Sequence, residues 1–195
     1  MYKSLLAAAV LVLAGCSSTA EPVTTTYLLP MNEASTTLLS ATAQQPVMIV
    51  RPVEVAQHLG GTGLVYQVSP TEVVQAQHNL WAESLSKQLT RAVIDDLRQK
   101  QSTYWFDQLT PVVNAMDLPK LQLQFTQFNG HYSGLAQLSG QWMVVNGEGE
   151  AVIRQPFFIQ VPLAEDGYNA QVKALSEGVE RLTTQISQRV SHLRL

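Results

Sequence analysis

The sequence predicts an α/β (α+β) fold in a single domain, in which a mixed, mainly antiparallel sheet carries two long helices on one face. Two stretches, residues 80–100 and 168–193, repeat apolar side chains every three or four positions, as amphipathic helices do. Residues 121–126 alternate apolar and polar side chains, which is the pattern of a strand with one buried face. The resulting order of strand, strand, helix, three strands and helix favours one sheet with both helices on the same side.

The first residues predict a secretory signal peptide at residues 1–15. Lys3 supplies a positive charge, residues 5–13 are apolar without interruption, and the small residue Gly15 stands directly before Cys16. The apolar run is too short to span a bilayer core of ~30 Å as a helix.

Cys16 is the only cysteine of the chain, so it cannot form an intramolecular disulfide. The run Leu13-Ala14-Gly15-Cys16 resembles a bacterial lipobox, which is cut between its last two residues. This resemblance implies an S-diacylglyceryl group on the thiol and an N-acyl chain, such as palmitate, on the new amino terminus. Several acyl chains make membrane attachment effectively permanent, and Ser17 after the cysteine implies the outer membrane. The alternative is an ordinary signal peptide with an incidental cysteine.

Residues 16–46 are expected to hold the lipidated terminus and a tether, because Ser, Thr, Ala, Gln and Pro dominate there. A short first edge strand is expected at residues 27–30. The folded domain is then predicted to cover residues 47–195. Its first strand is expected at residues 47–55, where Pro52 confines it to an edge or to a strand end.

The first helix is predicted over residues 80–100, with Asn79 as its amino-terminal cap. It follows a glycine turn at residues 60–63 and a strand at residues 64–68. The buried stripe of this helix is formed by Leu85, Leu89, Val93 and Leu97.

An antiparallel meander of three strands is predicted after the first helix. The polar side chains of its first strand, which face water or a partner, are Gln122, Gln124 and Thr126. The second strand is expected at residues 134–145, and the Asn-Gly-Glu-Gly run at residues 146–149 predicts a hairpin turn into the third. The last helix contains Gly178, which costs ~1 kcal/mol relative to alanine and suggests close packing.

The polar residues predict neither a metal centre nor a catalytic site, so an enzyme is not expected. No two of the histidines are spaced i, i+4 as on a helical metal site. The glycine turn lacks the lysine of a phosphate-binding loop. Asp95 and Asp96 are adjacent in a helix and point apart, which favours a solvated face near Arg91 and Lys100.

The charge of the chain argues against nucleic acid as a partner. Its 12 Lys and Arg against 15 Asp and Glu give a formal net charge of −3 without a basic block. The three tryptophans, Trp81, Trp105 and Trp142, are candidate partner anchors, although core packing is the commoner role of tryptophan.

Short motifs along the whole domain resemble the PqiC-type lipoproteins of the paraquat-inducible transport system, within the ABC-transport auxiliary lipoproteins. After the lipobox, the matching segments are YLLP at 27–30, GTGLVYQ at 61–67, NLWAESL at 79–85, FNGHYSG at 128–134, SGQW at 139–142 and DGY at 166–168. Ser84 departs from the pattern, in which proline is expected, and this leaves the start of the first helix open. Residues 31–46 and 101–118 match poorly and are interpreted as tether and loop.

The resemblance implies a periplasmic docking subunit on the inner leaflet of the outer membrane. Its implied partners are an MCE-domain protein that spans the periplasm and the inner-membrane subunit of the same phospholipid-transport system. Docking to a symmetric tube favours a homo-oligomeric ring. The candidate partner or subunit contacts are His58, Gly61, Gly63, Tyr66, Trp81, Gln122, Gln124 and Thr126.

Two other functions stay open at this point. A lipid carrier requires a sizeable apolar cavity between the sheet and the long helix. An envelope hydrolase requires a serine or threonine within hydrogen-bond reach of one of the four histidines.

Overall fold

The computed structural model describes residues 22–30, 40–42, 44–111 and 117–194. Its elements are β1 (Thr25–Tyr27), β2 (Val47–Val50), β3 (Glu54–Val55), a 3₁₀ turn η2 (Gln57–Leu59), β4 (Gly63–Ser69), β5 (Glu72–Trp81), α2 (Leu85–Lys100), β6 (Trp105–Gln108), β7 (Lys120–His131), β8 (Leu135–Val145), β9 (Ala151–Pro162) and α4 (Tyr168–Val190). The nine strands form one mixed sheet.

Strand β7 is the centre of this sheet. One of its edges pairs with β8 over its whole length in antiparallel register, and β8 pairs in the same way with β9. The other edge takes three short parallel partners in succession: β2 at Leu121, β3 at Phe125 and β4 at His131. Beyond them, β6 pairs with β2, and β5 and β1 extend the sheet from β4.

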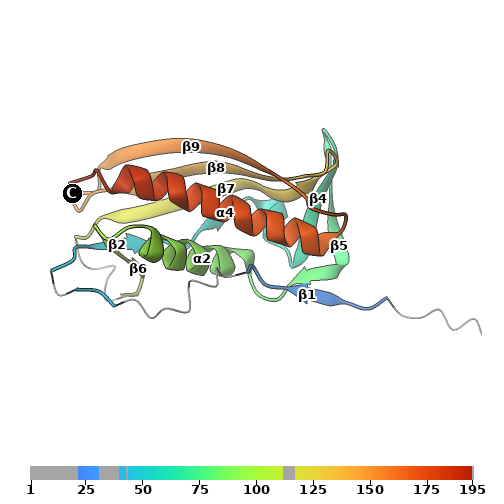
Figure 1. The fold of residues 1–195 in the computed structure, drawn as a ribbon, viewed down its shortest axis with the longest axis horizontal. Coiled ribbons are helices and arrows are strands. Elements are labelled where there is room, and N and C mark those ends of the chain that lie inside the picture. The colour runs from blue at the N-terminus through green and yellow to red at the C-terminus, as the bar shows by residue number, and fades with distance from the viewer. Residues whose placement is uncertain (1–21, 31–39, 43, 112–116, 195) are drawn as a thin grey trace, which may run out of the picture.

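The two helices lie side by side on the same face of the sheet, as the sequence predicts (Figure 1). Helix α4 packs against β8 and β9, and α2 packs against β6 and α4. The predicted stripe of α2 is buried between them, and Leu89, Val93 and Leu97 have no exposed surface. Both helices are therefore held by one continuous apolar core.

Gly178 marks a close approach of α4 to the sheet. A Cβ built at this position would overlap the buried side chain of Leu138 in β8. The close packing that the sequence suggests at this glycine is therefore present.

The predicted meander and its turn are also present. In the turn, the N–H of Gly149 donates to the carbonyl oxygen of Asn146 over 3.1 Å, and Gly149 has a φ of 88°. Glycine suits this position because other residues rarely adopt a positive φ.

The first helix begins later than the sequence predicts, at Leu85 instead of residue 80. Asn79 does not cap it, because it lies within β5, opposite Thr25 of β1. Its side-chain oxygen accepts a hydrogen bond from the Tyr27 hydroxyl over 2.9 Å. Pairing on both sides of β5 extends the strand to Trp81 at the expense of the helix.

Other boundaries also differ from the predictions. The strand expected at residues 47–55 is two strands, β2 and β3, separated at Pro52, and β2 lies inside the sheet between β7 and β6. Residues 101–118, interpreted as loop, contain β6. The first strand is an edge strand, as expected, but it covers Thr25–Tyr27 instead of residues 27–30.

Asp96 corrects the expectation of a solvated carboxylate pair. It is 6% exposed, and its Oδ2 lies 2.7 Å from the Lys100 ammonium. Its neighbour Asp95 is half-buried, and burial raises the pKa of the Asp95 carboxyl despite the nearby Arg98 and Arg91 guanidinium groups. Asp96 is buried because α4 packs beside α2 and brings Thr183 against its carboxylate.

Asp95→Asn is expected to stabilise the fold at pH 7 and to have no such effect at pH 3. Because the pKa of Asp95 is raised in the folded state, ionisation costs stability above that pKa, and the cost disappears when both states are protonated. Urea unfolding of both proteins at the two pH values measures this difference. An equal effect of the substitution at both pH values would contradict the assignment to ionisation.

Candidate docking surface

The helices leave the opposite face of β7, β8 and β9 uncovered. Because directly opposed residues of paired strands share a face, the register defines the side chains of this surface. We call this surface the amide face; it consists of Gln122, Gln124, Thr126, Gln127, Ser139, Gln141, Met143, Pro156 and Phe158. All of its members are half-buried or exposed.

Hydrogen bonds between side chains connect the strands across the amide face. The Gln141 amide nitrogen donates to the Gln124 side-chain oxygen over 3.0 Å. The Ser139 hydroxyl donates to the Gln127 side-chain oxygen over 2.9 Å and lies 2.9 Å from the Thr126 hydroxyl. These bonds reduce the freedom of the side chains, so less entropy remains to be lost when a partner binds.

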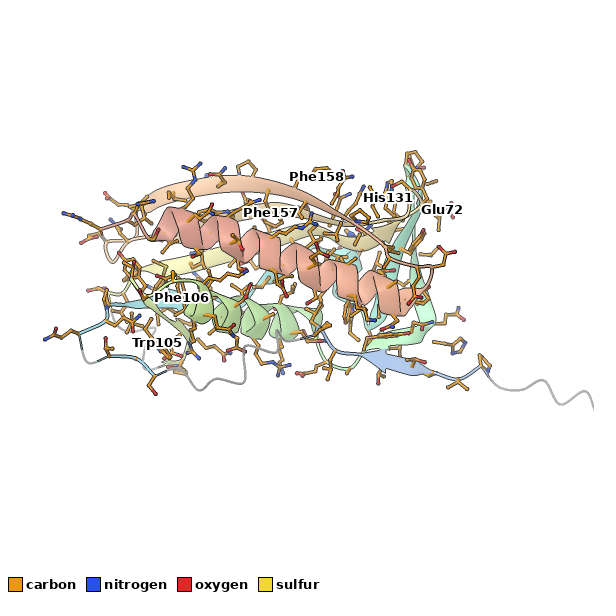
Figure 2. All side chains as sticks on the ribbon, viewed as in Figure 1. Glu72, Trp105, Phe106, His131, Phe157 and Phe158 are labelled. Carbon is orange, nitrogen blue, oxygen red and sulfur yellow. The ribbon has the colours of Figure 1, made fainter. Side chains whose placement is uncertain are left out.

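Phe158 is the large apolar residue of the amide face and is 62% exposed. Its neighbour Phe157 is 7% exposed and packs edge to face on Phe125, with 5.1 Å between ring centroids. Both are labelled in Figure 2, on the strand that forms the outer edge of the meander. Alternation along β9 therefore buries one phenylalanine against the helices and exposes the next.

The amide face carries almost no charge. The chain has no Asp, Glu, Lys or Arg between Lys120 and Glu148, a span that includes the rest of β7 and all of β8. On the paired part of β9 the exposed cation is Arg154, opposite Met143. Depletion of charge together with an exposed aromatic side chain is typical of the centre of a protein–protein interface.

A hollow of ≈ 150 Å³ adjoins the amide face where β2 ends and β3 begins. Arg51 and Glu54 line it from this break, and Gln124, Gln141 and Met143 line it from the meander. A second hollow of ≈ 210 Å³ lies between α4 and the meander, beside Trp142. Both are open and smaller than the ~300 Å³ at which ligand pockets begin, so neither has the size of an acyl-chain cavity.

Of the sequence-predicted contacts, Gln122, Gln124 and Thr126 lie together on the amide face. His58 and Gly61 are exposed around η2, where the His58 carbonyl accepts a hydrogen bond from the Gln75 side chain over 2.7 Å. Cys16 and Gly15 lie outside the described residues.

The other three predicted contacts, Gly63, Tyr66 and Trp81, are engaged in packing or hydrogen bonding within the domain. Gly63 is buried, and a Cβ there would overlap the carbonyl oxygen of Ala76. The Tyr66 hydroxyl donates to the His131 carbonyl over 3.0 Å. Trp81 is 5% exposed and packs on Phe128, with 6.2 Å between ring centroids. The other two tryptophans are likewise engaged, because Trp142 is 1% exposed and Trp105 stacks under the Arg98 guanidinium.

Sequence reasoning missed Gln127, Ser139, Gln141 and Phe158 as members of the same surface. A bulge between Phe125 and Gln127 interrupts the period of two in β7, so simple alternation could not place Gln127. The neighbouring Phe157 and Phe158 were the available signal, because one of two adjacent strand residues must face away from the core.

Two histidines do lie within reach of a hydroxyl. His131 Nδ1 is 2.6 Å from the Ser133 hydroxyl and also accepts the Ser133 N–H over 3.2 Å, within an exposed turn. His78 Nδ1 is 3.4 Å from the Thr24 hydroxyl at the exposed edge strand. In the described part of the chain, neither histidine is hydrogen-bonded or ion-paired to a carboxylate, and no group of three His, Cys, Asp or Glu side chains could hold a metal ion.

A membrane-spanning helix is not found among the described residues, since none of their helices is both long and apolar enough.

Comparison with known proteins identifies the family. The model of the ABC-type transport auxiliary lipoprotein component matches residues 27–187. The chain is 35% identical over 195 residues to the intermembrane transport lipoprotein PqiC of Escherichia coli (strain K12), covering 99% of this chain and 100% of that protein. The protein of the same name from Shigella flexneri matches to the same extent.

Solved structures share the fold. The crystal structure of an uncharacterized protein aligns with a TM-score of 0.72 at 27% identity, over 87% of this chain and 99% of the other. A protein of Xanthomonas campestris aligns with a TM-score of 0.67 at 14% identity, over 87% and 100% of the two chains. The family model covers most of the described domain and the full-length relatives agree with it, so the chain belongs to the ABC-type transport auxiliary lipoproteins and is of the PqiC type.

Proposed function

We propose that this protein is a docking subunit of an intermembrane phospholipid-transport system, held on the periplasmic face of the outer membrane by lipids on Cys16. The single observation that carries the docking role is the amide face, which is nearly free of charge and is covered by neither α2 nor α4. The name of the PqiC relatives supports intermembrane transport as the setting. The partners would be a periplasm-spanning MCE-domain protein and its inner-membrane subunit, and the role would require no catalysis.

Several properties of the amide face suit a protein partner. Its amide groups can donate and accept hydrogen bonds without the desolvation cost of buried charges. Phe158 offers an aromatic anchor of the kind that dominates binding energy. The same surface could hold copies of this chain in a ring around a tubular partner, as docking to a symmetric tube favours.

Site-directed crosslinking in the native envelope tests the docking role. Cys16 is the only cysteine, so a cysteine introduced by Phe158→Cys would be the only free thiol of a lipidated chain. We expect its crosslinks to contain an MCE-domain protein, with or without further copies of this chain, when products are identified by mass spectrometry. Thr184→Cys is the matched control, because Thr184 is exposed on α4, on the helical side of the sheet.

The outcomes separate the three functions. Crosslinks from both positions alike, or none to an MCE-domain protein from Phe158→Cys, would contradict docking through the amide face. A monomer that co-purifies with phospholipid would instead favour the carrier. Hydrolysis of an envelope substrate that is lost in Ser133→Ala would favour the enzyme.

A further inference from the structure

A second exposed surface lies at one end of the molecule and is distinct from the amide face. Four large apolar side chains are exposed there, and we call them the apolar tip: Val68, Val73, Val74 and Tyr132, which are 38%, 45%, 40% and 50% exposed. Three of them belong to the β4–β5 hairpin and the fourth to the turn between β7 and β8.

Backbone pairing holds these side chains at the same end of the sheet, with the successive residues Val73 and Val74 on opposite faces of the hairpin. The Tyr132 N–H donates to the Gln67 carbonyl over 3.0 Å, which fixes the turn to β4. Gln67 is in turn paired with Val73 across the hairpin, and Tyr66 is paired with Val74. The Tyr132 ring also stacks on His131, with 4.1 Å between centroids. The apolar tip is therefore held in place by the sheet.

The segments that form the apolar tip contain no Lys or Arg. The chain has no Lys or Arg between Arg51 and Lys87, and none between Lys120 and Arg154. The carboxylate of Glu72 borders the tip, and Figure 2 shows Glu72 and His131 at this end. Exposed valines beside an amphipathic tyrosine suit the interface of a neutral lipid bilayer, whereas these segments offer no Lys or Arg to an anionic lipid.

The path of the chain brings this end toward the proposed anchor. β1 runs parallel to β5, with Thr25 opposite Asn79, and Figure 1 shows β1, β4 and β5 at the end of the molecule opposite the C-terminus. From Asn79 back to Val73 the strand measures about 20 Å at ~3.3 Å per residue. The chain between Cys16 and Thr25 can extend at most about 30 Å. A membrane that holds Cys16 therefore lies within reach of the apolar tip.

We propose that the apolar tip rests in the surface of the bilayer to which Cys16 is attached and so sets the orientation of the domain. This inference rests on the lipid anchor of the proposed function but not on the docking partner. A single flexible tether leaves a domain free to turn, whereas a tether and an inserted tip together fix its long axis relative to the membrane. The meander would then extend away from the bilayer, into the periplasm.

Depth-dependent quenching tests the proposal on the full lipidated chain. Val73→Cys is labelled with an environment-sensitive fluorophore, and the protein is reconstituted into phosphatidylcholine vesicles that contain spin-labelled lipid. We expect a blue shift and strong quenching, unchanged when phosphatidylglycerol is added. The control is Glu148→Cys, in the exposed turn at the far end of β8, where quenching should be absent. Val74→Asp in the Val73→Cys background should abolish the quenching.

Each failure has its own signature. A chain that carries no lipid on Cys16 by mass spectrometry overturns the anchor and this inference with it. A lipidated, vesicle-bound chain whose labels at positions 73 and 148 are equally unquenched overturns the apolar tip alone. The label at position 73 could also stay unquenched in vesicles while a cysteine at this position crosslinks to a protein in native envelopes. That result would show that the tip binds a protein, and it would overturn lipid contact.

Discussion

Lys100→Met is expected to lower the free energy of unfolding by about 3 kcal/mol, because it leaves a buried carboxylate without its counterion. The Lys100 ammonium lies 2.7 Å from Asp96 Oδ2 in its own helix and 2.9 Å from the Thr183 hydroxyl of α4. It also donates to the Glu180 carbonyl over 2.6 Å. The substitution removes all of these contacts at once, including the two hydrogen bonds that Lys100 makes from α2 to α4.

The carboxylate has little else to compensate its charge. Asp96 Oδ2 accepts a hydrogen bond from the Thr183 hydroxyl, and Oδ1 has no hydrogen-bond partner in the described structure. The Asp96 side chain is only 9% exposed, so water solvates its charge poorly. Removing one member of such a pair costs far more than removing both.

Urea unfolding followed by tryptophan fluorescence measures this effect. The double variant Asp96→Leu with Lys100→Met should recover much of the loss, since Thr183 retains its hydrogen bond to the Val179 carbonyl. The control Lys87→Met removes an exposed lysine from the same helix and should change stability by less than about 0.5 kcal/mol. If Lys100→Met behaves like this control, the ion pair does not link the helices.

Gly140→Ala is expected to destabilise the fold by about 3 kcal/mol, the upper end of the usual cost of overpacking. Gly140 lies in β8 opposite Phe125 of β7, beside the bulge. A Cβ at this position would overlap the carbonyl oxygen of Gln124 and would lie 3.0 Å from the ring of Phe157. Because the first obstacle is backbone, the two central strands must separate to admit the methyl group.

Gly60→Ala serves as the matched control for this substitution. At that exposed position, a Cβ would have only the carbonyl oxygen of Gln57 nearby, at 3.3 Å. The same unfolding experiment should give a change of less than about 0.5 kcal/mol. Equal effects of the two substitutions would mean that β7 and β8 can part more easily than their geometry indicates.

The elements that periodicity predicts are those whose burial is regular. α4 has one apolar face along its length, and the meander strands alternate over much of theirs, so both were predicted closely. β5 was missed because its first residues are exposed on both faces, so its sequence does not alternate. β6 was missed because it is a short strand, defined by its parallel pairing to β2, a long-range contact without a local signal.

The same limit applies to the candidate surface. Gln122, Gln124 and Thr126 could be selected from the sequence because they alternate with buried residues of one strand. That Phe158 lies on the same face depends on the register of β8 against both neighbours, which the sequence does not reveal. The burial of Asp96 was equally hidden, because it depends on the packing of α4 beside α2.

The arrangement of three short parallel strands along one edge of β7 also bears on how the chain folds during synthesis. β2, β3 and β4 all precede Lys120, where their common partner begins. Until the ribosome has passed β7, only the β4–β5 hairpin can pair locally among these strands, and α4, which closes the core, is made last. Such dependence on distant contacts slows folding. The topology therefore delays completion of the core until nearly the whole chain has been synthesised.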